Sequence, residues 1–337
     1  MSQFTHVIAH PNIALAKYWG KSPSGSNVPA VPSLSVTLAG MSTRTRLRFV
    51  ERGLPQDQVR VGGTLLQGAE AARAQAMLDT VRRAAGITAY AEVESENDFP
   101  TASGLASSAS GYAALALASV RAAGLDWDLS QISELARCAS ASAGRSLFGG
   151  FVTMVPDGDR CRTGSIASEA ALDLSVVVCV VTEEAKAVSS RVGMNETSAR
   201  SPFYAAWLEL APKNFEALSA ALLRGDFAQV GELSEQSALS MHASALAANV
   251  VYLRGVSLDL LRAVRGLRAQ GLMAYATMDA GPHVKVLVPS AQAEQVRTAL
   301  QQVPGVLRTI HTRPGPGARV VSPNDDGSLT TVAGGAA

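Results

Sequence analysis

The sequence has 337 residues, of which 47% are hydrophobic and 17% are charged, and its formal net charge is +1. This length exceeds the usual size of one domain and the composition allows a sizeable core, so we expect a folded protein of two domains. Positive and negative residues nearly cancel without a long run of either sign, which disfavours a nucleic-acid partner. The apolar stretches are too short to span a bilayer, and the N-terminus lacks a basic region followed by an apolar segment. We therefore expect a cytoplasmic protein with no membrane partner.

The three cysteines, Cys138, Cys161 and Cys179, favour a reducing environment. Their spacing does not suit a metal site, and any disulfide would leave one of them unpaired. No neighbouring histidine or basic cluster would lower a thiol pKa, so we interpret all three as packing residues and not as nucleophiles.

The first half of the chain predicts an N-terminal sheet followed by helices. Runs of β-branched and apolar residues between turn residues predict strands, and helical periodicity with capping residues predicts helices. The stretches 5–19 and 35–51, which also contain turn residues, predict an N-terminal sheet, and 60–66 predicts a further strand or hairpin arm. Residues 87–95, 151–155 and 172–181 predict strands, the last nearly all apolar and so buried on both faces. The predicted helices are 70–85, which stops at Gly86, 104–123, which stops at Gly124, and one from about 129, where Asp128 and Gln131 are spaced as a capping pair.

The second half predicts helices first and then a further sheet. Ser201-Pro202 opens a helix that ends at Gly225, Asp226 caps the next, and Ser257 caps one that ends at Gly271. Residues 272–278 and 283–288 predict paired strands about a turn, and 290–302 predicts a helix. We expect an N-terminal domain over 1–182, a C-terminal α+β domain over 183–321, and a small, polar, glycine-rich tail over 322–337 that is disordered.

Residues 100–109, Pro-Thr-Ala-Ser-Gly-Leu-Ala-Ser-Ser-Ala, lie between a predicted strand and a predicted helix. Free N–H groups and the positive end of the helix dipole at such a start bind phosphate oxygens. No Gly-Lys-Ser/Thr follows the glycine, so the segment is not a Walker motif, and Mg²⁺ or distant side chains must neutralise the charge. The alternative is a Ser/Gly-rich turn before a buried helix. The candidate phosphate-binding residues are Ser103, Gly104, Leu105, Ala106, Ser107 and Ser108.

Four side chains elsewhere are candidates for chemistry. Lys17 and Lys21 belong to Ala-His-Pro-Asn-Ile-Ala-Leu-Ala-Lys-Tyr-Trp-Gly-Lys, although a surface strand would also show Lys and Tyr. Arg145 stands alone among Ser, Ala and Gly over 140–151, where its guanidinium can bind a carboxylate through two hydrogen bonds, but an isolated Arg is usually a solvated surface group. Asp279 ends an apolar strand beside Gly281-Pro282, where an aspartate is often only a local cap.

The segment 188–194, Val-Ser-Ser-Arg-Val-Gly-Met, predicts a loop that precedes a capped helix. By composition alone it has no special function.

Taken together, these motifs resemble a known enzyme family. The proline four residues before Gly-Leu-Ala-Ser-Ser-Ala is similar to the ATP loop of the GHMP kinase superfamily, and Lys-Tyr-Trp-Gly-Lys resembles its mevalonate diphosphate decarboxylases. Order and spacing match from about residue 5 to residue 288. The family more often has Gly at Ala139 and Ala141, Cys at Gly144 and Asn at His283, and we assign no effect to these departures or to Pro32. The resemblance implies an α+β, two-domain GHMP-kinase-like fold with the active site in the cleft between the domains.

The resemblance also implies a reaction. ATP, with Mg²⁺, phosphorylates the 3-hydroxyl of mevalonate 5-diphosphate, and loss of that phosphate with CO₂ gives isopentenyl diphosphate. Asp279 is then the base or hydroxyl-orienting residue, Lys17 its partner and Arg145 the carboxylate holder. The implied substrate contacts are Tyr18, Lys21, Ser140, Ser142, Ser190 and Arg191. We expect Mg²⁺ to arrive with ATP, with Ser107 as a candidate contact, and not to sit in a protein-only metal cluster.

Three alternatives remain open. A mevalonate-related kinase, or a decarboxylase of a differently phosphorylated mevalonate, would share the ATP loop and much of the scaffold. A nonenzymatic regulator that binds ATP or a sugar is a different class. The presence of Lys17, Arg145 and Asp279 together favours full decarboxylation. A homodimer, common in the family, is the candidate assembly.

Overall fold

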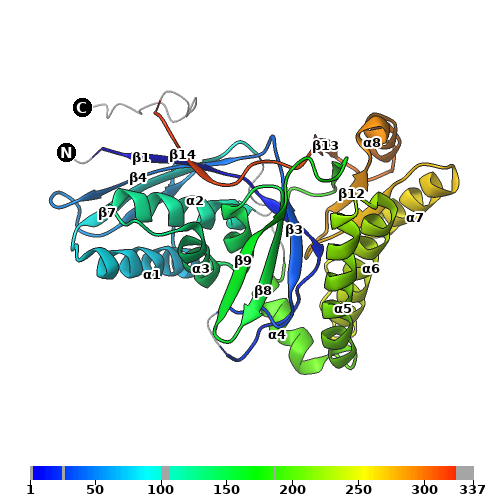
Figure 1. Ribbon diagram of the computed structural model, residues 1–337, viewed down its shortest axis with the longest axis horizontal. Coiled ribbons are helices and arrows are strands. Elements are labelled where there is room, and N and C mark those ends of the chain that lie inside the picture. Colours follow the sequence, from blue (N-terminus) through cyan, green and yellow to red (C-terminus); the bar gives the residue numbers. More distant parts are fainter. Residues whose placement is uncertain (1–2, 25–26, 100–106, 185–186, 324–337) are drawn as a thin grey trace.

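The computed structural model describes residues 3–24, 27–99, 107–184 and 187–323. The chain forms two α+β halves, and a sheet that contains β3 (Ser33–Thr37), β8 (Phe151–Asp157) and β9 (Arg160–Ala167) lies between their two groups of helices (Figure 1). The predicted α+β class is confirmed. The predicted phosphate-loop residues Ser103, Gly104, Leu105 and Ala106, and all but the first two residues of the predicted tail, lie outside the described residues.

The N-terminal half is a six-stranded sheet with helices on one face (Figure 1). Strand β4 (Thr43–Val50) alternates buried and half-buried residues, because one face packs on helices and the other does not. In sheet order the strands are β14 (Arg319–Val321), β1 (Thr5–Ala9), β4, β7 (Tyr90–Asn97), β5 (Gln58–Val61) and β6 (Thr64–Leu65). The covering helices are α1 (Gly68–Ala85), α2 (Ser107–Ala122) and α3 (Leu129–Ala139), whose apolar residues form one core cluster with the sheet.

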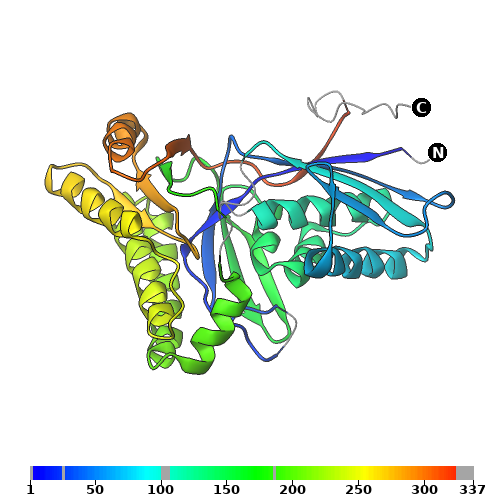
Figure 2. The same cartoon turned by 180° about the vertical axis from the view of Figure 1, so that it is seen from behind.

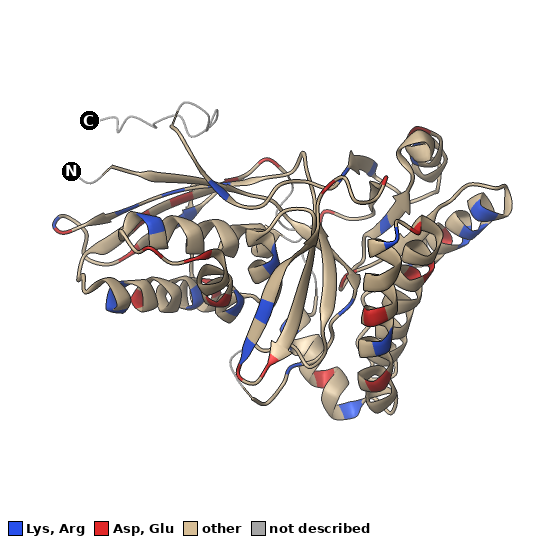
Figure 3. Cartoon of the chain, viewed as in Figure 1, with Lys and Arg blue, Asp and Glu red and all other residues tan. Residues whose placement is uncertain are grey.

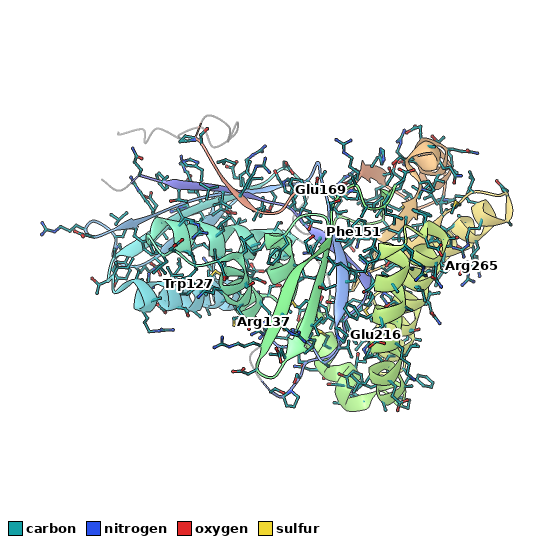
Figure 4. The ribbon with its side chains drawn as sticks, viewed as in Figure 1. Trp127, Arg137, Phe151, Glu169, Glu216 and Arg265 are labelled. Atoms are coloured by element: carbon teal, nitrogen blue, oxygen red, sulfur yellow. The ribbon has the colours of Figure 1, made fainter. Side chains whose placement is uncertain are left out.

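A second sheet joins the two halves. Its order is β2 (Asn12–Ala16), β3 (Ser33–Thr37), β8 (Phe151–Asp157) and β9 (Arg160–Ala167). The fully buried Phe151 lies at the junction, where it packs in a core cluster with residues of α5, α6 and β10 (Figure 4). Strand β9 was not predicted, since its residues are mostly polar and half exposed and give no apolar alternation.

The C-terminal sheet has the order β11 (Tyr275–Thr277), β12 (Val284–Val288), β10 (Ser175–Val180) and β13 (Arg308–Thr312). Alternate β10 residues enter two different core clusters, so both its faces are buried, as its apolar run predicted. The helices of this half are α4 (Ser190–Arg200), α5 (Tyr204–Leu223), α6 (Phe227–Leu246), α7 (Gly255–Ala269) and α8 (Ala293–Gln301), and α5 to α7 lie at the end remote from α1 (Figures 1 and 2). Because β10 pairs with β12 and β13, it belongs to the C-terminal sheet, and the division at 182/183 stays a prediction.

Several predicted caps are confirmed. Gly86 ends α1 in the left-handed conformation with φ 66°, and Asp128 and Gln131 form a capping box at α3. The Asp226 carboxylate accepts the Gln229 N–H at 3.1 Å at the start of α6. These positions were predictable because a cap is satisfied by residues close in sequence.

Two local predictions were wrong, and one element was not predicted. Helix α4 begins at Ser190, so 188–194 is not a loop: the Ser189 hydroxyl caps it by accepting the Val192 N–H at 3.3 Å. Residues 141–147 form a 3₁₀ helix, η1, for which the sequence predicted no element. Helix α7 starts before Ser257, whose hydroxyl lies within the first turn and donates to the Pro282 carbonyl at 2.8 Å.

Charge and helix length agree with the composition. Acidic and basic residues are interspersed along both halves (Figure 3). Among the described residues, no helix combines the length and apolarity that crossing a bilayer requires.

Candidate active site

An ion pair joins the two halves of the chain. Lys17 follows β2 and Asp279 follows β11, and the Lys17 Nζ donates to Asp279 Oδ1 at 2.8 Å. The same ammonium donates to the Ala14 carbonyl at 2.6 Å, and the Lys17 N–H donates to the Ser237 hydroxyl at 2.9 Å. The Lys17 side chain is 2% exposed and that of Asp279 is 28% exposed. The carboxylate is therefore fixed by a buried cation while it keeps access to the site.

Asp279 has two further partners. Lys285 of β12 donates to Asp279 Oδ2 at 3.1 Å, and His242 Nε2 of α6 lies 2.9 Å from the Asp279 carbonyl oxygen. A carbonyl only accepts, so His242 carries its proton on Nε2. Burial lowers the pKa of His242 to about 4, so its ring is neutral.

The two lysines set the charge of Asp279. Burial by itself would raise the pKa of this carboxyl, but Lys17 and Lys285 outweigh burial and hold the pKa well below its usual range. Burial lowers the pKa of Lys17 to about 8, although the charge of Asp279 opposes it. At neutral pH, Asp279 is thus ionised and Lys17 is mostly charged.

Arg145, on η1, lines a cavity together with Lys17 and Asp279. Its Nη1 donates to the Ser33 hydroxyl at 2.7 Å, and its Nη2 and Nε donate to Asn12 Oδ1 at 3.1 and 3.3 Å. The Asn12 amide in turn donates to the Ser146 hydroxyl at 2.7 Å and to the Ser142 carbonyl at 3.0 Å. A guanidinium has five N–H groups, so one on each terminal nitrogen stays available, which suits a carboxylate.

Most of the predicted site residues that the structure describes share one cavity. Lys17, Tyr18, Ser108, Ser142, Arg145, Ser190 and Asp279 all line it. Arg145 also lies over the Tyr18 ring, and its Cζ atom is 5.5 Å from the ring centroid. Burial raises the pKa of Tyr18, so its phenol stays protonated and can donate a hydrogen bond.

Three predicted substrate contacts lie beside this cavity and not in its lining. The Lys21 Nζ is 5.4 Å from the Tyr18 ring centroid, Arg191 Nη2 donates to Asn27 Oδ1 at 3.1 Å, and the Ser140 hydroxyl is 3.3 Å from that of Ser142. Burial, reinforced by the charges of Arg191 and Arg137, lowers the pKa of Lys21 to about 8. Mutually repelling cations beside a cavity form a site for an anion.

A second cavity meets the first at the start of α2. Ser107 and Ser108 line it, and Ser108 lines both cavities. Its other walls include the apolar Val59 and Leu66 together with Tyr112. The first turn of α2 holds no acidic residue, so the positive end of its dipole is not neutralised within the turn. Apolar walls beside a helix N-terminus suit a nucleotide base and its phosphates.

Sequence reasoning missed four residues of the site. It assigned no role to Asn12 or Ser33, which orient Arg145, or to Lys285 and His242, which hold Asp279. Lys285 gave a signal that could have been used, because it is one charge within an otherwise apolar strand. The other three are ordinary polar residues whose partners are far away in sequence.

Two α+β halves, an ionised aspartate held by lysines between them and a helix N-terminus nearby define an ATP-dependent enzyme of the two-domain GHMP-kinase-like fold. The protein-family model for the diphosphomevalonate decarboxylase-like N-terminal domain matches residues 9–167. The family model for the mevalonate 5-diphosphate decarboxylase C-terminal domain matches residues 176–320. The chain belongs to the diphosphomevalonate decarboxylase family.

Individual relatives agree with this assignment. The diphosphomevalonate decarboxylase of Candida albicans is 34% identical over 94% of this chain and 97% of its own length. The phosphomevalonate decarboxylase of Haloferax volcanii is 33% identical over 87% of this chain and 90% of its own. The mevalonate diphosphate decarboxylase of Staphylococcus aureus has a similar structure, with a TM-score of 0.90 and 36% identity over 96% of this chain and 99% of that one. A complex of MDDEF with MVAPP, AMPPCP and magnesium has a TM-score of 0.87 and 36% identity over 94% and 98% of the two chains.

Proposed function

We propose that the protein catalyses the ATP-dependent decarboxylation of mevalonate 5-diphosphate to isopentenyl diphosphate, with ADP, phosphate and CO₂ as the other products. The observation that carries the proposal is that Asp279, Lys17 and Arg145, from three distant segments, line one cavity that also reaches Ser108. The substrate has a carboxylate and a hydroxyl on neighbouring carbons and a diphosphate at its far end. Each of these groups has a chemically matched partner in or beside the cavity.

Arg145 binds the substrate carboxylate. Its remaining N–H groups form the two-pronged donor, and the bonds to Asn12 and Ser33 fix the plane of the guanidinium before the substrate arrives. The carboxylate has to be held in a defined orientation, because the C–C bond that releases CO₂ must align with the C–O bond that releases phosphate.

Asp279 binds the 3-hydroxyl by accepting its hydrogen bond. Because two ammonium groups hold its pKa low, Asp279 is a weak base that orients the hydroxyl oxygen and takes the proton only as the oxygen–phosphorus bond forms. Lys17 places a positive charge beside the same oxygen. The C–O bond then breaks with release of phosphate, and the electrons of the C–C bond to the carboxylate form the new double bond as CO₂ leaves.

The nucleotide has its matched site at the start of α2. ATP with Mg²⁺ supplies the phosphoryl group, and Ser107 and Ser108 contribute N–H groups and hydroxyls to its phosphates. Within the described ranges, no three His, Cys, Asp or Glu residues gather as a metal site. We assign the Mg²⁺ to the ATP phosphates, with the Ser107 hydroxyl as its protein contact.

The diphosphate end of the substrate is bound by Tyr18, Lys21, Ser140, Ser142, Ser190 and Arg191. The second candidate function is decarboxylation of mevalonate 5-phosphate, and the observation that favours it is the similarity to the Haloferax volcanii phosphomevalonate decarboxylase. The two substrates differ by one phosphate, so the cations at Lys21 and Arg191 should decide between them.

The family resemblance also supports a homodimer and a cytoplasmic location. Sedimentation equilibrium of the purified protein tests the first, and fractionation of the source cells tests the second.

The proposed function is tested by the product balance. The purified protein is incubated with Mg-ATP and, separately, with mevalonate, its 5-phosphate and its 5-diphosphate, while ADP, phosphate and CO₂ are followed together. Equal amounts of the three products from the diphosphate alone support the proposal. Equal amounts from the monophosphate alone support the second candidate, ADP without CO₂ identifies a kinase, and no turnover refutes both decarboxylase assignments.

A further inference from the structure

Lys285 is a buried charge that the proposed reaction does not directly use. The chain has 29 lysines and arginines, of which only five are lysines. Two of these five, Lys17 and Lys285, contact Asp279. Lys285 is the second residue of β12, whose other four residues are Val or Leu, and its side chain is 1% exposed. Burying a lysine costs free energy unless the charge is paired.

Stability does not explain this lysine. Replacing a buried ion-pair partner by an apolar residue of similar size is often neutral or stabilising when no uncompensated charge remains. Here Asp279 would keep Lys17 as its partner at 2.8 Å. An apolar residue would also continue the face of β12 on which Leu287 packs into a core cluster. A methionine at position 285 should therefore fold as well as the lysine does.

The contacts point to a role that acts through Asp279. Lys17 occupies Oδ1 and Lys285 occupies Oδ2, so each carboxylate oxygen has its own ammonium. The torsion that turns an aspartate carboxylate is broad, and one ammonium alone would leave the group free to turn about that contact. Two ammonium groups on the two oxygens fix the plane.

Lys285 lies behind the carboxylate and not beside the substrate. Lys17 and Asp279 line the site cavity, whereas Lys285 is not part of the described lining. The exposed edge of the carboxylate therefore faces the cavity with Lys285 on its protein side.

We propose that Lys285 is a positioning residue: it holds the second oxygen of Asp279 so that the carboxylate meets the substrate hydroxyl in one fixed orientation. This role rests on the proposed function of Asp279. Removal of Lys285 should then slow the chemical step without weakening substrate binding.

The kinetic test compares Lys285→Met and Lys285→Gln with the matched control Thr277→Val. Thr277 faces Lys285 across the β11–β12 pair, is fully buried, and its hydroxyl has no hydrogen-bond partner in the part of the chain that the structure describes. We expect Lys285→Met to lower kcat about tenfold or more, with both KM values within about twofold of the wild type. Lys285→Gln, which can still donate to Oδ2, should lie between, and Thr277→Val should match the wild type.

A residue that only fills space would give a different order. Methionine would then serve as well as or better than glutamine, and the melting temperature would follow activity. We expect the opposite: Lys285→Met melts at or above the wild-type temperature and is the slowest variant. Wild-type kcat in Lys285→Met, or an equal loss in Thr277→Val, would overturn the proposal.

A second readout does not need turnover. Burial is the largest cause of the lowered pKa of Lys17, and the charge of Asp279 opposes it. The positive charges of Lys285 and Arg145 lower this pKa further. Carbon-13 labelling of the lysine Cε atoms gives five signals to titrate in the ligand-free protein, and Lys17→Arg assigns one of them. In Lys285→Met the Lys17 titration should move upward by about 0.5 pH units or more, and in Thr277→Val it should stay.

The two readouts separate the two proposals. If the wild type does not turn over either phosphorylated mevalonate but the Lys17 titration moves, the proposed function fails and the contact of Lys285 with the Asp279–Lys17 pair stands. If the titration does not move, the positioning role fails whatever the kinetics show.

Discussion

Lys17 and Asp279 are 262 positions apart, and the hydrogen bond between them, 2.8 Å from Nζ to Oδ1, joins the end of β2 in the second sheet to the end of β11 in the C-terminal sheet. The Lys17 N–H also donates to Ser237 of α6, so the lysine is fixed at its backbone as well as at its ammonium. The residues proposed for catalysis are thus oriented by contacts between the halves, and anything that shifts one half against the other should reduce catalysis.

Asp279→Asn should nearly abolish activity. The amide keeps the size of the carboxyl group but loses the charge that orients the hydroxyl and accepts its proton, so we expect kcat to fall by a factor of about 10² to 10⁴ with a smaller change in KM. Steady-state kinetics at saturating Mg-ATP measures the change. A variant that kept kcat within tenfold of the wild type would remove Asp279 from the chemistry.

Arg145→Lys should show that the two-pronged shape of the guanidinium matters beyond its charge. Lysine keeps the charge but cannot hold a carboxylate with two parallel bonds while it also bonds Asn12 and Ser33. We expect kcat/KM for the phosphorylated substrate to fall about tenfold to a hundredfold.

The matched control for this change is Arg268→Lys. Arg268 also binds its partner through two bonds, both 2.8 Å long, to the two oxygens of Glu235, but it lies outside the site cavity. That variant should lower the melting temperature and leave kcat/KM near the wild-type value. If both variants changed kcat/KM equally, the loss at Arg145 would reflect general disturbance of the fold.

The pH dependence should show an alkaline limit set by lysines. Lys17 and Lys21 each have a pKa of about 8 in the ligand-free protein, chiefly because of burial, so both lose their charge as the pH rises through this value. Since kcat/KM reports the free enzyme, it should fall above about pH 8. Asp279 stays ionised because its pKa is held low, so it should impose no acid limit near neutrality.

Lys21→Arg isolates one of the two titrations. Arginine remains charged, so the alkaline fall of kcat/KM should approach a one-proton dependence in this variant in place of a two-proton dependence. A kcat/KM that stays level to pH 9.5 in the wild type would show that neither lysine has to be charged.

The loop that carries Lys21 depends on a glycine. Gly20 has φ +104°, and a Cβ there would collide with the Tyr204 hydroxyl of α5. Gly20→Ala should therefore combine a backbone cost of about 1–2 kcal/mol with a steric clash, and should raise KM by displacing Lys21.

Gly40→Ala separates these two causes. Gly40 also has a positive φ, +70°, but no atom of the described residues lies within 4 Å of the added Cβ, so only the backbone cost remains. Denaturant midpoints and KM values of the two variants give the comparison, and Tyr204→Phe should partly restore Gly20→Ala. Equal behaviour of the two alanine variants would contradict the clash.

The sequence predicted what depends on local patterns. The turn at Gly86, the capping box at Asp128 and the apolar strand β10 are set by residues within a few positions, and all three are found. The short motifs also singled out Lys17, Arg145 and Asp279, which line one cavity, and their roles in it stay predictions.

Contacts between distant segments could not be predicted in the same way. Strand β14 forms only because the chain returns to pair with β1, and η1 is held by packing of small residues against α2 and α3. Asn12 and Arg145 are 133 positions apart, so the hydrogen bond between them is seen only in the folded structure. The loop expected over 188–194 failed because its serines satisfy the start of a helix and not a turn.

In the proposed mechanism the 3-hydroxyl is phosphorylated before CO₂ leaves, and an oxygen label in that hydroxyl distinguishes this order of events from others. Mevalonate 5-diphosphate carrying ¹⁸O in its 3-hydroxyl is converted by the protein with Mg-ATP, and the released phosphate is analysed by mass spectrometry. We expect one ¹⁸O in each phosphate, formed together with one CO₂, because the hydroxyl oxygen leaves with the phosphoryl group. Unlabelled phosphate formed together with CO₂ would contradict it, since the phosphoryl group would then never have been joined to the substrate oxygen.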